Sequence, residues 1–129
     1  MLKYLSDDWM DAAGAALAAD QDLAEASAEL DLGIDFEVTS TPLGKRRYGL
    51  RFHQGDVSLV NPPEGEAQVS FSADYETATA IATGELPIQV AFMQGRLKLG
   101  GDVAVLVRSG AALDRVGDTL ASLRDQTEF

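Results

Sequence analysis

The chain has 129 residues, a length that fits one domain and leaves no room for two. It contains no cysteine, which excludes disulfides, thiolate nucleophiles and thiolate metal sites. Its formal net charge of −11, from 21 acidic and 10 basic side chains, argues against nucleic acid as a partner, because phosphates would be repelled.

The basic side chains are concentrated in one short segment. Lys45, Arg46, Arg47 and Arg51 lie within seven residues, whereas residues 1–37 carry ten carboxylates and a single cation. Two roles are open for this cluster: transient contact with an anionic membrane surface, or a solvated hairpin whose cations balance an acidic helix. The surrounding carboxylates favour the hairpin.

No apolar run approaches the roughly 20 residues that a membrane-spanning helix requires. Acidic residues stand where a signal peptide would have its apolar segment, and the last residues do not match a peroxisomal address. We therefore expect a cytoplasmic protein.

The first thirty residues have the spacing of an amphipathic helix. Ser6 can cap its N-terminus, and Asp7 and Asp8 lie in the first turn, where the helix dipole favours anions. The helix is predicted to reach about Leu30, with a break near residues 20–22. Apolar side chains recur along it at helical spacing: Trp9, Ala12, Ala13, Ala16 and Leu17.

From residue 33 the period changes to two, which is typical of half-buried strands. Strands are predicted over 33–39, 47–53 and 57–60, with turns at 41–44 and 54–56. Their adjacency indicates an antiparallel meander. The side chains expected on its apolar face are Ile34, Phe36, Val38, Tyr48, Leu50 and Phe52.

The next segment begins with a loop around two consecutive prolines at 62–63, which cannot donate to a strand ladder. A fourth strand is predicted over 67–73, with Val69 and Phe71 inward. Asp74 can then cap a helix that ends at Gly84.

The remaining elements are short. A helix is predicted from Pro87 to Gly95, a fifth strand over 96–99, and two helices from Val103 and after Gly110. The last helix carries one narrow apolar stripe, formed by Leu113, Val116, Leu120 and Leu123. These elements predict a single α+β domain over 1–129, with a five-stranded, largely antiparallel sheet and helices covering one face.

The chain lacks the residue combinations that catalysis requires. Its only histidine, His53, is expected on a polar strand face, and one histidine without cysteine does not make a typical zinc site. Helix capping explains the carboxylate pairs at 7–8 and 20–22, and no glycine-rich phosphate-binding motif is present. Tyr48 could donate a proton, but no acid is predicted beside it. We expect no enzyme activity, no metal and no cofactor.

The segment 91–102, AFMQGRLKLGGD, carries a recognisable motif. It resembles the Phe-x-x-Gly-[Arg/Lys]-[Leu/Val]-Lys-x-x-Gly-[Asn/Asp] signature of sterol carrier protein type 2 domains. The segment 69–75 and the order of elements agree with that family, and the chain resembles a stand-alone bacterial member. The resemblance implies a fold that holds a lipid between a sheet and its helical cover. The matching positions are Phe92, Gly95, Arg96, Leu97, Lys98, Gly101 and Asp102.

We therefore expect a ligand cavity between the apolar sheet face and the helices at 75–94 and 103–124. Its ligand would be a hydrophobic small molecule: a sterol, fatty acid, acyl-CoA or similar lipid. The last helix, held by a single stripe and hinged at 109–110, is expected to open the cavity. The candidate lining residues are Phe36, Val38, Leu50, Phe52, Phe71, Ile81, Phe92, Met93, Leu97, Leu99, Val103, Leu106, Val107, Leu113, Val116 and Leu120.

Two other functions are compatible with the same sequence. The domain could be an interaction or dimerisation module with a collapsed cavity, its terminal leucine stripe contacting a partner. Less favoured is an enzyme that acts on a lipid-like substrate through Tyr48 and a carboxylate that the pattern does not reveal.

Overall fold

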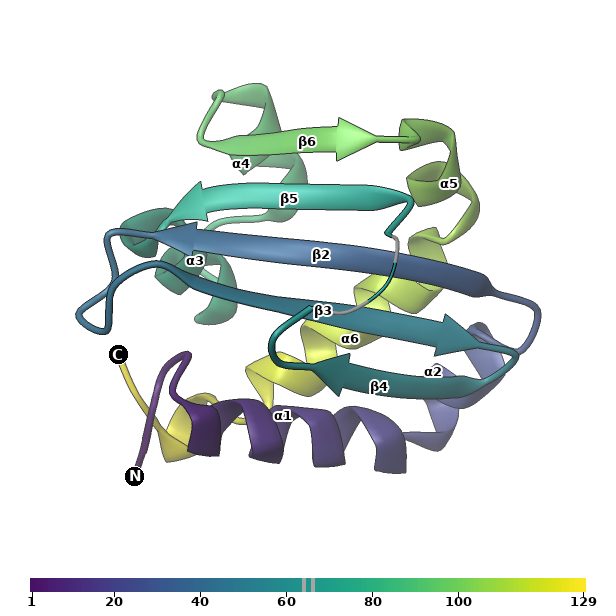
Figure 1. The fold of residues 1–129 in the computed structure, drawn as a ribbon, viewed down its shortest axis with the longest axis horizontal. Helices are drawn as coiled ribbons and strands as arrows, with labels where there is room; N and C mark the ends of the chain where they lie inside the picture. The colour runs from purple at the N-terminus through teal and green to yellow at the C-terminus, as the bar shows by residue number, and fades with distance from the viewer. Residues whose placement is uncertain (64, 66) are drawn as a thin grey trace.

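The computed structural model describes residues 1–63, 65 and 67–129, without the side chains of residues 88, 89, 103, 106 and 107. A five-stranded sheet forms its centre, with the strand order β4-β3-β2-β5-β6 (Figure 1). The strands are β2 (Asp31–Thr39), β3 (Arg46–His53), β4 (Asp56–Val60), β5 (Val69–Asp74) and β6 (Leu97–Gly101).

The sheet is largely antiparallel, as predicted. Strands β2, β3 and β4 form the expected meander, and β5 pairs antiparallel with β6. The pairing of β2 with β5 is parallel, because the connection after β4 crosses the sheet and brings β5 to the far side of β2 (Figure 1).

The register confirms the predicted apolar face. Ile34 lies opposite Leu50 on one side and Val69 on the other, and Phe36 lies between Tyr48 and Phe71 in the same way. Since side chains alternate along each strand, these residues share one face of the sheet.

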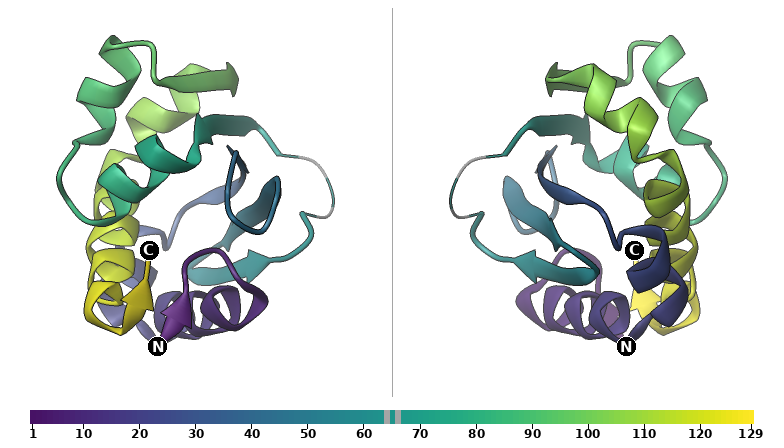
Figure 2. Two further views of the ribbon diagram at one scale, coloured as in Figure 1. Left: turned by 90° about the vertical axis from the view of Figure 1, so that its left-hand side faces the viewer. Right: turned by 90° about the vertical axis from the view of Figure 1, so that its right-hand side faces the viewer.

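The helices lie on that face, and α1 packs along the edge strand β4 (Figure 2). None of the helices in the described part of the chain is long and apolar enough to cross a membrane. Their bounds are α1 (Asp7–Ala19), α2 (Gln21–Ala26), α3 (Tyr75–Ala82), α4 (Ile88–Met93), α5 (Val103–Arg108) and α6 (Gly110–Ala121), and a 3₁₀ turn covers Arg124–Gln126.

The helix starts follow the predicted caps. The Ser6 hydroxyl accepts the Trp9 N–H at 3.2 Å, and the Asp74 carboxylate accepts the Thr77 N–H at 2.8 Å. Asp20 ends α1 with extended backbone and caps α2 by accepting the Leu23 N–H at 3.1 Å. The predicted break in the first helix is therefore a second N-cap.

The two chain ends form a pairing that the sequence pattern did not reveal. Strands β1 (Leu2–Lys3) and β7 (Thr127–Glu128) are parallel neighbours, and the ring of Tyr4 packs against those of Trp9, Tyr75 and Phe129. Two-residue strands are too short to show a period in sequence.

Candidate functional site

The apolar layer between sheet and helices has a closed half, next to α1 and α2. Leu17 on α1, Leu23 on α2, and Ile34, Leu50 and Phe52 on the facing strands are at most 2% exposed. Such complete exclusion of solvent is typical of a close-packed core, so there is no space for a ligand among these five side chains.

The other half of the same layer, over β2, β5 and β6 and beneath the later helices, is closed less completely. Its apolar side chains pack against the same core, but each keeps part of its surface accessible to solvent. Because its apolar side chains are incompletely covered, this half is the candidate for an apolar binding site. The half-buried side chains are Phe36, Ala73, Ile81, Leu86, Leu99, Val105, Leu113 and Leu120.

A ladder of aromatic rings crosses the floor of this layer. The rings of Tyr48 and Phe36 stack with centroids 4.9 Å apart, and those of Phe36 and Phe71 with centroids 5.2 Å apart. Burial raises the pKa of the Tyr48 phenol above its ordinary value of 10, so the group stays neutral at physiological pH. Its environment is that of a packing residue rather than of a proton donor.

The structure divides the expected lining residues into two groups. Val38, Leu50, Phe52, Phe71, Leu97 and Val116 are buried and form the packed base of the layer. Phe36, Ile81, Leu99, Leu113 and Leu120 are half-buried and keep solvent-accessible surface. The side chains of Val103, Leu106 and Val107 lie outside the described residues.

The two lining residues expected on α4 lie elsewhere. Phe92 is 51% exposed and Met93 83% exposed, whereas Ala91 is fully buried. Successive helical side chains are about 100° apart, so a helix that turns Ala91 to the core directs Met93 away from it. The expectation that Phe92 and Met93 form a wall of the cavity is therefore wrong for this structure.

Leu86 and Val105 belong to the half-buried layer although the sequence did not single them out. Leu86 follows Gly84 in a turn, where no periodicity assigns a face. Val105 lies in a six-residue helix that is apolar at five of its positions, so its pattern has no polar side to orient it.

Surface pockets occur at both ends of the layer. One, of about 580 Å³, is lined by Tyr75, Glu76, Thr79, Ala80, Glu85, Leu86 and Arg96, and it adjoins the half-buried layer through Leu86. The Thr79 hydroxyl is buried without a hydrogen-bond partner among the described residues. The other pocket, of about 620 Å³, lies between α1 and β4 and carries the carboxylates of Asp7 and Asp11.

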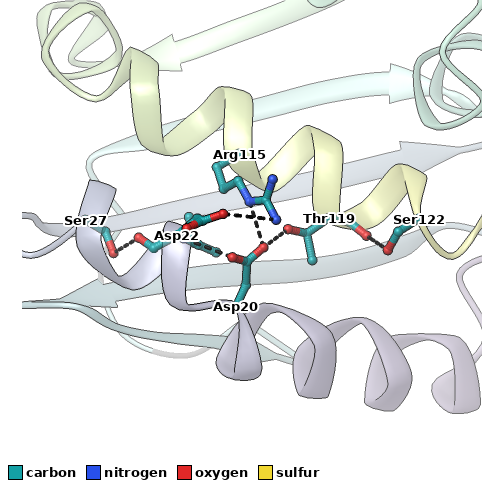
Figure 3. A network of polar contacts seen from close by, with 7 residues as sticks. Asp20, Asp22, Ser27, Arg115, Thr119 and Ser122 are labelled. Carbon is teal, nitrogen blue, oxygen red and sulfur yellow. Dashed lines mark hydrogen bonds and ion pairs between the residues drawn. The ribbon is translucent and has the colours of Figure 1, made fainter.

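A polar network fastens α6 to the junction of α1 and α2 (Figure 3). The Arg115 Nε donates to the Asp20 carboxylate at 2.9 Å, and the Thr119 hydroxyl donates to the same oxygen. The hydrogen bond from Thr119, with those from Leu23 and Arg115, lowers the pKa of Asp20 from 3.8 to about 2. An apolar stripe is therefore not the only attachment of α6, contrary to expectation.

The expected hinge between α5 and α6 is covered. Ser109 is 2% exposed, and its hydroxyl has no hydrogen-bond partner within the described part of the chain. A buried polar atom without a partner costs free energy, so this junction is a weak point in the packing.

The basic cluster is engaged mostly within the chain. Lys45 pairs with Glu37 at 3.0 Å, Arg51 with Asp35 at 3.0 Å, and Arg46 with Asp7 of α1 at 2.6 Å. The pairing of Arg46 with the acidic first helix supports the hairpin interpretation of this segment.

His53 is exposed on the polar sheet face, 3.7 Å from the Asp31 carboxylate. Among the described residues, no group of three or more His, Cys, Asp or Glu side chains could hold a metal ion.

One family model matches the chain, and several solved structures share its fold. The model of the SCP-2 sterol transfer family matches residues 13–114, whereas no curated protein matches the chain significantly. The crystal structure of a sterol carrier protein 2 superposes with a TM-score of 0.77, at 20% identity over 92% of this chain and 98% of that one.

Two solution structures show the same fold. A conserved hypothetical protein from Thermus thermophilus has a TM-score of 0.76, at 20% identity over 95% of this chain and 91% of that one. Palmitated SCP2L2 from Aedes aegypti has a TM-score of 0.58, at 16% identity over 89% of this chain and 94% of that one.

Proposed function

Because the chain belongs to the SCP-2 sterol transfer family, we propose that it binds a hydrophobic ligand, without catalysis, between its sheet and the helices from α3 onward. The observation that carries this proposal is the half-buried apolar layer over β2, β5 and β6. Palmitate on the related Aedes protein supports a fatty acid or another single-chain lipid as the ligand class.

Burial of an acyl chain gives enough free energy for binding without any charged group in the site. Burying an acyl chain of roughly 12–16 methylenes gives a gross gain of about 10–13 kcal/mol. Association and ordering cost several kcal/mol, so a micromolar or tighter dissociation constant is expected.

Ligand exchange requires the cover to open, and α6 is its proposed moving part. Opening must break the hydrogen bonds of Asp20 to Arg115 and Thr119, so Asp20→Asn is expected to accelerate release of a fluorescent fatty acid. Asp22→Asn is the matched control, because the Asp22 side chain is 75% exposed and lies 3.8 Å from Arg115. Equal rates in the wild type and Asp20→Asn would remove α6 as the gate.

The direct test is gentle mass spectrometry of the purified protein, followed by extraction and identification of lipids. A stoichiometric apolar molecule is the expected result. Protein that is empty, refuses a fluorescent fatty acid and dimerises with concentration would instead support an interaction module with a collapsed cavity.

A matched pair of variants locates the ligand. Leu113 on α6 and Leu59 on β4 are both half-buried leucines packed against the same core, at opposite sides of the layer. Leu113→Asn is expected to weaken fatty acid binding about tenfold or more, because it places an amide against the acyl chain. Leu59→Asn is expected to leave binding unchanged, and equal weakening by both would refute the proposed location.

A further inference from the structure

The outward side of α4 is an exposed apolar surface. Val90 is 37% exposed, Phe92 51% and Met93 83%, which makes this six-residue helix the site of three of the six exposed large apolar side chains described. Exposed apolar groups of this size gathered on one element mark interaction sites more often than chance exposure.

The segment that contains α4 differs in charge from the rest of the sequence, although Glu76 and Glu85 share a pocket with Arg96. Residues 86–101 contain no carboxylate, although the chain carries 21 of them and a net charge of −11. Two cations, Arg96 and Lys98, follow α4 directly, and both are exposed. An anionic surface would repel most of this protein, so the corner formed by α4 and β6 is a favoured point of approach.

We propose that this corner, formed by Val90, Phe92, Met93, Arg96 and Lys98, docks on an anionic lipid bilayer. Phe92 and Met93 enter the boundary between head groups and acyl chains, while Arg96 and Lys98 contact lipid phosphates. The basic hairpin at 45–51 is a weaker candidate, because most of its cations pair with carboxylates of the chain itself.

The size of the surface favours a bilayer over a second protein. Three partly exposed side chains offer on the order of 300 Å² of apolar surface. A stable protein–protein interface buries about 800 Å² on each partner, far more than α4 presents. Insertion of a few apolar side chains beside cations is sufficient for reversible membrane binding.

Docking at this corner deepens the proposed carrier function and rests on it. Helix α4 packs on β6, and Leu99 of β6 belongs to the half-buried layer (Figure 1). A bilayer in contact with α4 would therefore lie beside the proposed ligand site, which is the arrangement that lipid exchange requires.

The absence of cysteine allows a site-specific test. Met93→Cys and Leu43→Cys are each labelled with an environment-sensitive nitrobenzoxadiazole probe and mixed with phosphatidylcholine vesicles containing about 30 mol% phosphatidylglycerol. Leu43 is the matched control, because it is 48% exposed and lies next to the basic hairpin. The probe at 93 is expected to shift to the blue and to rise about threefold in emission, while the probe at 43 stays unchanged.

Unlabelled variants test the same contact by vesicle co-sedimentation. Phe92→Ser with Met93→Ser is expected to weaken vesicle binding about tenfold or more. Lys98→Gln is expected to weaken binding several-fold at low salt and little at high salt. Leu43→Ser is expected to have no effect.

Three results would overturn the docking surface: no response at position 93, an equal or larger response at position 43, or concentration-dependent dimerisation that the double serine variant abolishes. Ligand uptake in solution is measured on the same proteins. Retained uptake with lost docking refutes the docking surface alone, whereas docking without uptake refutes the carrier function.

Discussion

Alanine substitution of two leucines on one sheet face tests the division of the core into a closed and an open half. Leu50 on β3 has no exposed surface, whereas Leu99 on β6 is half-buried, although both lie on the helix-covered face. Leu50→Ala leaves a cavity in a closed site and is expected to lower the free energy of unfolding by about 3–5 kcal/mol. Leu99→Ala removes contacts from a site that is already open and is expected to cost about 1–2 kcal/mol.

The assay is urea unfolding of delipidated protein followed by far-ultraviolet circular dichroism, with linear extrapolation to water. Equal slopes for the variants and the wild type would establish that the same surface unfolds in each. A fatty acid at about 100 times its dissociation constant is expected to stabilise the wild type by about 2.7 kcal/mol, and Leu99→Ala by less. Losses of the same size for the two variants without ligand would refute the division of the core.

Four further predictions use other parts of the fold. Gly101 has φ +89°, and a Cβ there would lie 2.1 Å from the Gln68 carbonyl oxygen, so Gly101→Ala should cost at least about 2 kcal/mol in the same assay. A Cβ added at Gly117, on the exposed face of α6, would meet no atom within 4 Å. Gly117→Ala should therefore raise the free energy of unfolding by about 0.5–1 kcal/mol, and a decrease would contradict the exposed position of Gly117. The pKa of Asp20 is about 2 in the folded chain, below its ordinary value of 3.8. The ionised carboxylate therefore stabilises the fold above pH 4, and this stabilisation is lost as the pH falls toward 2. The melting temperature of Asp20→Asn should fall less than that of the wild type over this pH range. Tyr48→Phe should leave fatty acid binding unchanged, and a large loss would favour a chemical role for the phenol.

The sequence alone was sufficient where neighbouring residues decide the structure. Alternation in β2 and β3 showed which side chains face the core, and the register confirmed it. Ser6, Asp20 and Asp74 were identifiable as caps because a cap bonds to an N–H only three residues away. The motif at 91–102 indicated the family, and the family match over residues 13–114, which includes the motif, confirms it.

Which face of a short apolar helix packs on the core could not be predicted in this way. In α4 the four residues from Val90 to Met93 are all apolar, so no polar side orients the helix, and its exposed face was expected in the cavity. Packing on β6 decides the orientation: among the described side chains of α4, Ala91 is fully buried, whereas Phe92 and Met93 are exposed.

Partners distant in sequence were likewise beyond the pattern. The parallel pairing of β5 with β2 and the bond of Arg115 to Asp20, 95 residues apart, arise only when the chain is folded. The division between a closed and an open half of the core could not be predicted either. Leu50 and Leu99 are the same residue type, and they differ only in how completely the helices cover them. Local periodicity and capping thus predicted most of the elements and the apolar face, and the motif at 91–102 indicated the family. Long-range packing, in which each contact depends on segments that share no local pattern, decided which part of the apolar layer stays half-buried and which face of α4 points outward.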